Sequence, residues 1–157
     1  MKLQTGHLTP LAHGTQNGCF GCGDANETGL ALKFYVDEDG LVLCRFTLEK
    51  RFEGPPGYAH GGIIATLLDE AMSKANRYRG VYAMTRQMEI DFLRPVSLGV
   101  ELLLEGHSAS EEGRKHRCSA ELRDQAGHLL ATGRGLFVEV KREKMLGVDV
   151  STDTAAT

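Results

Sequence analysis

The sequence predicts an α+β protein in which a curved antiparallel sheet wraps around one long central helix. Two strand-like segments precede the single strongly helical segment, and four more strand-like segments follow it. Helices and strands that are segregated along the chain favour an antiparallel sheet over a parallel wound one. The helix is the only long element that the sequence offers to cover the inner face of that sheet.

The two segments before the helix form a predicted hairpin. GLALKFYV (29–36) and LVLCRFTL (41–48) have strand composition, and DEDG (37–40) between them has turn composition. The loop 49–59 follows and is marked by its Gly-Pro-Pro-Gly centre.

Residues 62–78 are predicted to be helical because their apolar residues recur at the spacing of one helix face. These residues are Ile64, Leu67, Leu68, Ala71 and Ala75. Asp69 lies on the flank of this stripe, whereas Glu70 points away from it. We expect Glu70 at the surface, paired with Lys74 four residues later.

Four strand-like runs follow the helix, at 83–94, 99–107, 114–124 and 128–140. Alternation of apolar and polar residues in these runs is typical of a sheet with one face in water. Cys44 and Cys118 fall in strand patterns and are expected in the core.

The composition is that of an ordinary globular protein of one domain. The chain has 157 residues, of which 41% are hydrophobic, and its net charge of -3 argues against general nucleic-acid binding. No apolar run approaches the length of a membrane span, so no membrane association is expected and a cytoplasmic location is the simplest prediction. Four scattered cysteines are too few for a secreted disulfide framework.

The chain is expected to divide into three parts. Residues 1–18 are polar and form a flexible N-terminal arm, residues 19–142 form the domain, and residues 143–157 form a disordered tail.

The helix opens with His60, Gly61 and Gly62, which is an unusual start. The first turn of a helix leaves backbone N–H groups unpaired and carries partial positive charge. Because the two glycines have no side chains, a ligand carbonyl oxygen could approach these N–H groups, which suits the binding of an oxyanion. The alternative is that the glycines only permit a tight turn into the helix.

Asp69 is the second candidate for chemistry. A carboxylate at the edge of an apolar stripe needs a partner or a purpose, because burial alone is costly. It could act as a general base or as a nucleophile on an acyl carbon. The alternative is a surface acid, and His60 could likewise orient a substrate or be solvated in its loop.

Together, His60-Gly61-Gly62, a mainly apolar run and Asp69 nine residues after the histidine resemble the hotdog-fold acyl-CoA thioesterases. The closest likeness is to the PaaI-like and 4-hydroxybenzoyl-CoA thioesterase branch. IDFLRP (90–95) is similar to the strand after the helix in that branch, and residues 19–30 are similar to its N-terminal element. The resemblance covers roughly residues 19–140.

This resemblance implies hydrolysis of an acyl-CoA to a free acid and CoA, without a cofactor or a catalytic metal. Asp69 matches the catalytic carboxylate, and Gly62 matches the residue whose N–H polarises the thioester carbonyl. His60 matches a histidine near the thioester, and Thr85 matches a hydroxyl residue that helps to position the hydrolytic water.

The substrate-binding residues implied by the resemblance are Gly61, Arg94, Pro95, Arg114 and Lys115. The basic residues among them are chemically suited to the phosphates of CoA. Many members also carry a polar side chain about six residues before the histidine, where this chain has Gly54. Glu53 or a backbone group could take over that role. The acyl group stays open.

In the family that the chain resembles, the helix N-terminus and the carboxylate of one site come from different protomers. A homodimer is therefore implied, and a dimer of dimers is the expected assembly. The main alternative is a non-catalytic acyl-CoA sensor with the same fold. A hotdog dehydratase and a zinc or redox module built on Cys19 and Cys22, with His7 and His13 as further ligands, are weaker alternatives.

Overall fold

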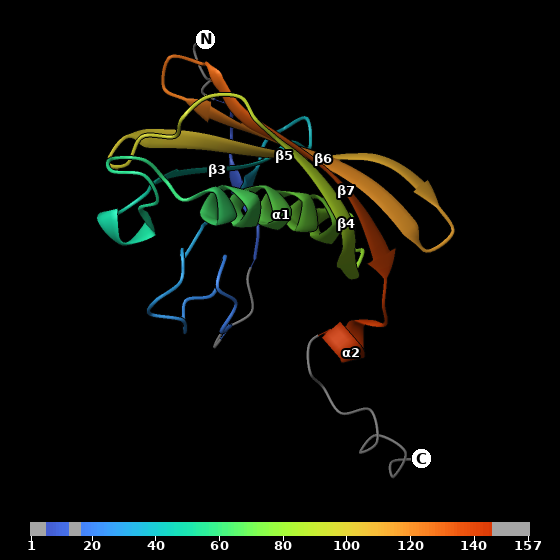
Figure 1. Cartoon of the computed structure of the whole chain (residues 1–157). Helices are drawn as coiled ribbons and strands as arrows, with labels where there is room; N and C mark the ends of the chain where they lie inside the picture. Colours follow the sequence, from blue (N-terminus) through green and yellow to red (C-terminus); the bar gives the residue numbers. More distant parts are fainter. Residues whose placement is uncertain (1–5, 13–16, 146–157) are drawn as a thin grey trace, which may run out of the picture.

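A strongly curved sheet wraps around one long helix in the computed structural model, which describes residues 6–12 and 17–145 (Figure 1). The strands are β1 (Thr9–Pro10), β2 (Tyr35–Val36), β3 (Val42–Thr47), β4 (Ala83–Phe92), β5 (Glu101–Glu112), β6 (Lys115–Asp124) and β7 (Leu129–Glu139). The helices are α1 (Gly61–Tyr78), the short α2 (Arg142–Met145) and a 3-10 turn, η1 (Lys50–Phe52). The α+β architecture predicted from the sequence is confirmed.

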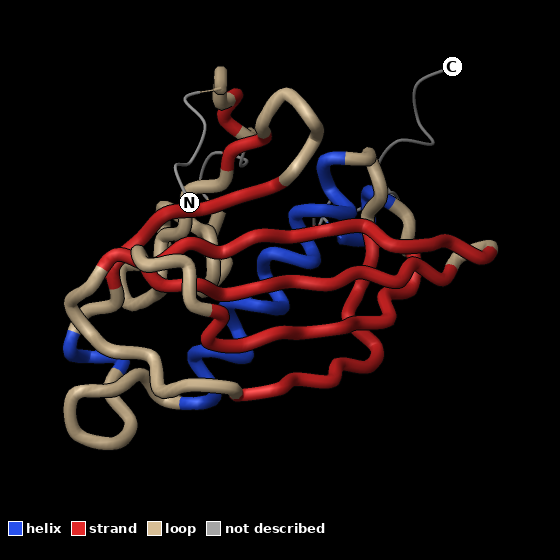
Figure 2. The backbone as a smooth tube through the Cα atoms, turned by 90° about the horizontal axis from the view of Figure 1, so that it is seen from above, coloured by secondary structure: helices blue, strands red, loops and turns tan. Residues whose placement is uncertain are grey.

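The seven strands form one antiparallel sheet in the order β1-β2-β3-β5-β6-β7-β4. Seen from above, the strands cross over α1, which lies beneath them (Figure 2). β4 follows α1 directly in the chain but pairs with β7, at the far edge of the sheet. β4 also packs against α1. Among the described strands it pairs with β7 alone, which leaves its other edge free.

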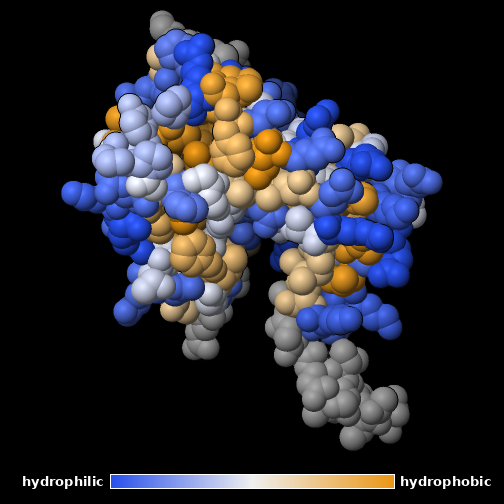
Figure 3. Space-filling view, in the orientation of Figure 1, coloured by the Kyte–Doolittle hydropathy of each residue, from blue (hydrophilic) through white to orange (hydrophobic). Residues whose placement is uncertain are grey.

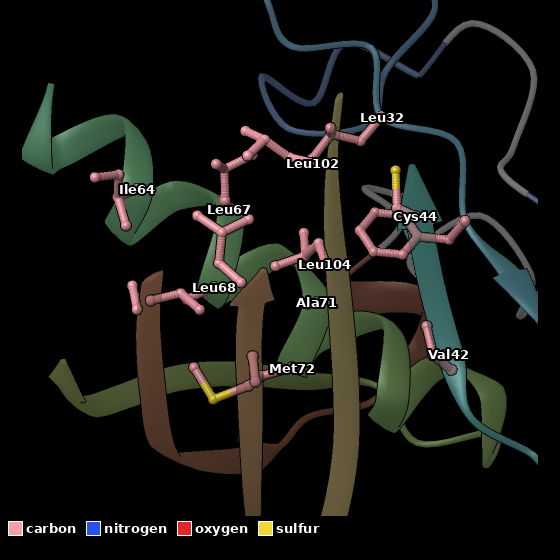
Figure 4. Packing of buried hydrophobic residues seen from close by; sticks show 14 of the residues in the cluster. Leu32, Val42, Cys44, Ile64, Leu67, Leu68, Ala71, Met72, Leu102 and Leu104 are labelled. Atoms are coloured by element: carbon pink, nitrogen blue, oxygen red, sulfur yellow. The ribbon is translucent and has the colours of Figure 1, made fainter. Parts of the chain in front are cut away.

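The core lies between α1 and the concave face of the sheet (Figure 4). From the predicted helical stripe, Leu67, Leu68 and Ala71 are fully buried. They meet residues from β5 and β3, including Leu102, Leu104, Val42 and Cys44. Cys44 and Cys118 are both buried, so their predicted place in the core is confirmed.

The N-terminal segment differs most from the prediction. The expected strand 29–36 is reduced to β2, because the backbone N–H groups of Leu30 and Leu32 donate to Phe20 O and Gly21 O rather than to a strand. Figure 1 shows the blue loops around residues 20–30 on the side of α1 that faces away from the sheet.

Part of the flexible arm expected at 1–18 is ordered in the structure. Thr9–Pro10 pairs with Tyr35–Val36 as an edge strand, and the Leu11 N–H donates to Phe34 O, so these residues belong to the sheet. Residues 1–5, 13–16 and 146–157 lie outside the described part, and with them most of the tail expected at 143–157.

Within the described ranges, no helix is both long and apolar enough to cross a membrane. The cytoplasmic location stays a prediction.

Candidate active site

The N-terminus of α1 is capped by the side chain of His60. His60 has extended backbone geometry, and its Nδ1 accepts a hydrogen bond of 2.9 Å from the Gly62 N–H. The His60 carbonyl accepts from the N–H groups of Ile63 and Ile64. Among the described residues, the Gly61 N–H is the one donor of this first turn that has no partner.

The two glycines at the helix start have different surroundings. A Cβ on Gly62 would lie 3.1 Å from His60 Nδ1, so the absence of a side chain lets the imidazole fold back over the helix end. A Cβ on Gly61 would meet only Phe92 Cε1, at 3.8 Å, which is an ordinary contact. Both residues are exposed, as a site for a substrate oxygen requires.

Gly54 occupies the place where many members of the resembled family carry a polar side chain. Its backbone passes so close to His60 that a Cβ would lie 2.7 Å from His60 Cα. The neighbouring Glu53 is exposed and its Oε1 accepts the Gly57 N–H at 2.8 Å. Glu53 therefore closes the loop 53–57 in this structure.

Asp69 meets Thr85 on the neighbouring edge strand β4. The Thr85 hydroxyl donates a hydrogen bond of 2.6 Å to Asp69 Oδ1. Burial raises the pKa of the Asp69 carboxyl above its ordinary value of 3.8, and the nearby Glu70 charge raises it further. The Thr85 hydrogen bond acts in the opposite direction and favours the carboxylate. The result is an oriented carboxylate that is a stronger proton acceptor than a solvated aspartate.

Asp69 and Gly62 of one chain lie too far apart to act on the same atom. They are seven residues apart on one helix, which corresponds to about 10 Å along its axis. A nucleophile and an oxyanion donor must both lie about 3 Å from the reacting group. Within one chain, Asp69 and the Gly62 N–H therefore cannot both reach the same reacting group.

The predicted CoA-binding residues fall at opposite ends of β4. Arg94 and Pro95 are exposed just after β4 ends, whereas Arg114 and Lys115 lie beside the strand pair that begins at Ala83. Ten residues of strand separate the two groups, or roughly 30 Å. Arg114 already donates from Nε and Nη2 to Glu139 O, at 3.2 and 2.8 Å.

Glu70 is not the surface acid that the sequence suggested. Its wheel position does point away from the sheet, but the loop that carries Cys19 and Cys22 covers it, leaving the residue 9% exposed. The predicted ion pair with Lys74 is confirmed, with Nζ 3.3 Å from Glu70 Oε1. The Cys-x-x-Cys spacing in the sequence indicated a possible metal or redox motif, but no sequence pattern predicted that this loop packs on α1 over Glu70.

A curved antiparallel sheet wrapped around one long helix fits the class of hotdog-fold thioesterases. Comparison with known families agrees, since the sequence model described as the thioesterase superfamily matches residues 56–131. Acyl-coenzyme A thioesterase 13 of Homo sapiens is 30% identical over 98 residues, which cover 60% of this chain and 70% of that protein. The chain belongs to the thioesterase superfamily.

Other relatives fit this assignment. Acyl-coenzyme A thioesterase THEM4 of Xenopus laevis is 31% identical over 108 residues, or 68% of this chain and 49% of that protein. The chain thus spans about half the length of THEM4. A solved thioesterase superfamily protein is 34% identical with a TM-score of 0.71, covering 74% of this chain and 60% of its own. The E. coli PaaI protein shares the fold, with a TM-score of 0.67 at 24% identity over 75% of this chain and 86% of its own.

Proposed function

We propose that this protein hydrolyses the thioester of an acyl-CoA to a free acid and CoA, with Asp69 as the catalytic carboxylate. The observation that carries the proposal is the Thr85 hydroxyl held 2.6 Å from the half-buried Asp69 carboxylate. The names of the relatives THEM4 and acyl-coenzyme A thioesterase 13 support the same class of reaction.

Asp69 can act in either of two ways. As a general base it takes a proton from a water molecule, whose oxygen attacks the thioester carbonyl carbon. As a nucleophile it attacks that carbon itself and forms a mixed anhydride, which a water molecule then hydrolyses. In both cases the C–S bond breaks, the CoA sulfur leaves as a thiolate that takes up a proton, and a carboxylic acid is released.

The negative charge that develops on the carbonyl oxygen needs donors that are already in place. We assign this role to the Gly62 N–H at the N-terminus of α1. Its present acceptor is His60 Nδ1, so the thioester oxygen takes over this hydrogen bond as the imidazole turns aside. The unpaired Gly61 N–H adds to the positive potential of the same helix end.

A complete site needs two chains, because Gly62 and Asp69 of one chain are about 10 Å apart. We propose a homodimer that pairs through the free edge of β4, where only Ala83 of the ten residues is buried. Phe92 on this strand and Leu93 directly after it are 57% and 54% exposed, and Met84 near its start is 57% exposed, so pairing at this edge would remove large apolar side chains from water. Figure 3 shows apolar patches at the surface between polar side chains.

The separation of the basic residues fits the same assembly. Arg94 of one chain and Arg114 with Lys115 of the other would lie along one CoA, although they are roughly 30 Å apart within a chain. A dimer of dimers is the expected larger assembly.

The test is the turnover of acyl-CoAs with short, medium and aromatic acyl groups, followed as free CoA. Asp69→Asn should lower kcat about 10³-fold or more while binding of the CoA thioester is kept. Asp39→Asn, at an exposed acid in a distant turn, is the matched control and should not change kcat. Wild-type turnover in Asp69→Asn would overturn the assignment of Asp69.

The same assay separates the enzyme from the non-catalytic alternative. A sensor would bind one of these acyl-CoAs without releasing CoA at any enzyme concentration. That result for the wild-type protein would replace the proposed hydrolysis by acyl-CoA sensing.

A further inference from the structure

Three side chains with metal-binding atoms meet on the face of α1 that points away from the sheet. They are Cys19 and Cys22 of the N-terminal loop and Glu70 of the helix. Their two sulfur atoms and one carboxylate oxygen all lie within 4.8 Å of one another. None of these side chains contacts the thioester in the proposed hydrolysis.

The distances suit a tetrahedral zinc ion. Zinc binds sulfur at about 2.3 Å and carboxylate oxygen at about 2.0 Å, so tetrahedral angles place two such ligand atoms about 3.5 Å apart for S and O, and about 3.8 Å apart for S and S. Cys19 Sγ lies 3.8 Å from Glu70 Oε2 in this structure. Small side-chain rotations are therefore enough to bring the three atoms onto one ion.

The loop is shaped to hold both cysteines over the helix. Gly21 lies between them, and a Cβ at this position would be 2.6 Å from Glu70 Oε2. The Gly23 N–H donates to Cys19 O at 2.9 Å, and the Cys19 N–H donates to Asn17 Oδ1 at 2.9 Å. The backbone thus turns tightly around the two thiols and passes directly over the carboxylate.

Lys74 forms an ion pair with one of the two carboxylate oxygens of Glu70. Its Nζ lies 3.3 Å from Glu70 Oε1 and 3.1 Å from Cys22 Sγ. Oε2 is left facing Cys19, and Cys22 is 2% exposed. Two thiolates and one carboxylate carry three negative charges, which a divalent ion and the Lys74 ammonium balance to zero. A neutral cluster is the least costly way to bury these charges.

We propose that Cys19 Sγ, Cys22 Sγ and Glu70 Oε2 bind a zinc ion, with the fourth position open to water and with Lys74 as a hydrogen-bond donor to the cluster. Binding replaces one proton on each thiol, so about two protons are released per zinc ion and no electron is transferred. The ion would link the N-terminal loop to α1. Its helix ligand, Glu70, directly follows Asp69 in the sequence.

Glu70 takes the place that the sequence suggested for histidines. His7 is not part of the cluster, and His13 lies outside the described residues. A second group of potential ligands, Glu105, His107 and Glu121, contains no thiol, and Glu121 already accepts from Arg123 Nη2 at 2.6 Å. A signal that depends on thiolates therefore distinguishes the two places.

The test is a titration of the full chain with Co²⁺, a spectroscopic substitute for zinc, under metal-free reducing conditions. We expect one Co²⁺ per chain with a thiolate-to-metal absorption band that zinc abolishes. Cys19→Ser and Cys22→Ser should remove the band, and Glu70→Gln should weaken binding roughly tenfold or more. Cys118→Ser is the matched control, since this buried thiol lies outside the cluster, and it should leave the band unchanged.

Three measurements on the wild-type protein test the zinc site without relying on any variant. Zinc should release about two protons per ion, and its apparent affinity should rise about 100-fold per pH unit while both thiols are protonated. Zinc should also protect Cys19 from alkylation. The absence of a thiolate band, its persistence in Cys19→Ser, or zinc binding without proton release would each overturn the proposed site. Loss of catalysis in Asp69→Asn would not affect these readouts.

Discussion

The Thr85 hydroxyl lies 2.6 Å from Asp69 Oδ1, and this hydrogen bond connects the edge strand β4 to the central helix α1. Thr85 is exposed and Asp69 is half-buried, so the bond lies where the buried helix flank meets the solvent. It orients the carboxylate and stabilises its charged form against the effect of burial.

Removal of this hydroxyl should therefore impair catalysis without breaking the fold. We expect Thr85→Val to lower kcat about 10- to 100-fold, since Asp69 loses the hydrogen bond that orients its carboxylate. Thr85→Ser keeps the hydroxyl and should retain most of the activity. Steady-state turnover of an acyl-CoA checks both, and equal losses in the two variants would contradict a role for the hydroxyl.

The pH profile reports the environment of Asp69. Burial raises its pKa above 3.8, with a further increase from Glu70, and only the carboxylate can act as base or nucleophile. The value of kcat/KM should thus fall as the pH drops through the raised pKa, at a higher pH than an ordinary aspartate would cause. Because the Thr85 hydrogen bond lowers the pKa, Thr85→Val should move this acid limb to still higher pH. An acid limb at or below pH 3.8 would contradict the prediction.

The same shift predicts a cost in stability. A carboxyl group whose pKa is higher in the folded than in the unfolded state destabilises the fold above the folded pKa. This cost decreases as the pH falls through the folded pKa and is gone below the unfolded value of about 3.8. Asp69→Asn should therefore unfold at a higher temperature than the wild type at pH 7. The difference should vanish at low pH, which thermal denaturation at several pH values would show.

The two glycines at the start of α1 offer a matched pair of variants. Gly62→Ala places a Cβ 3.1 Å from His60 Nδ1 and pushes the imidazole off the helix end, whereas Gly61→Ala meets only an ordinary contact. Loss of the cap costs about 1 kcal/mol, and replacement of glycine by alanine in a helix gains about 1 kcal/mol. Gly62→Ala should thus keep its stability. Its methyl group would crowd an oxygen placed where His60 Nδ1 now lies, so kcat/KM should fall roughly tenfold or more although the N–H is kept. Gly61→Ala should be affected less, and the reverse order would contradict the role of Gly62.

Local patterns were enough to predict the helix and the long strands. The apolar spacing from Ile64 to Ala75 predicted a helix at 62–78, and the structure has it at Gly61–Tyr78. The predicted strands after the helix are also present, because their alternation depends only on neighbouring residues. Asp69 and Thr85 were each named as site residues from the resemblance alone. Their hydrogen bond was not predicted, since no pattern within the chain relates a helix flank to a strand edge.

Features that depend on distant parts of the chain could not be predicted. Glu70 points away from the sheet, as its wheel position indicated, yet a loop fifty residues earlier covers it. The pairing of Thr9 with Val36 depends on where that loop leads the chain. The bond from the Gly62 N–H to His60 is local, but its formation depends on the orientation of a side chain.

The proposal that each active site is shared between two chains can be tested by mixing two inactive variants. In a mixed dimer of Asp69→Asn and Gly62→Val, one site combines the intact Asp69 of the second variant with the intact helix end of the first. The other site has both defects. Each homodimer should be nearly inactive, and mixing them under conditions that exchange subunits should restore activity. Complete random exchange should give about one quarter of the wild-type value, because half of the dimers are mixed and each of these has one good site. If both halves of the site came from the same chain, no mixture would recover activity, and steady-state rates before and after exchange distinguish the two arrangements.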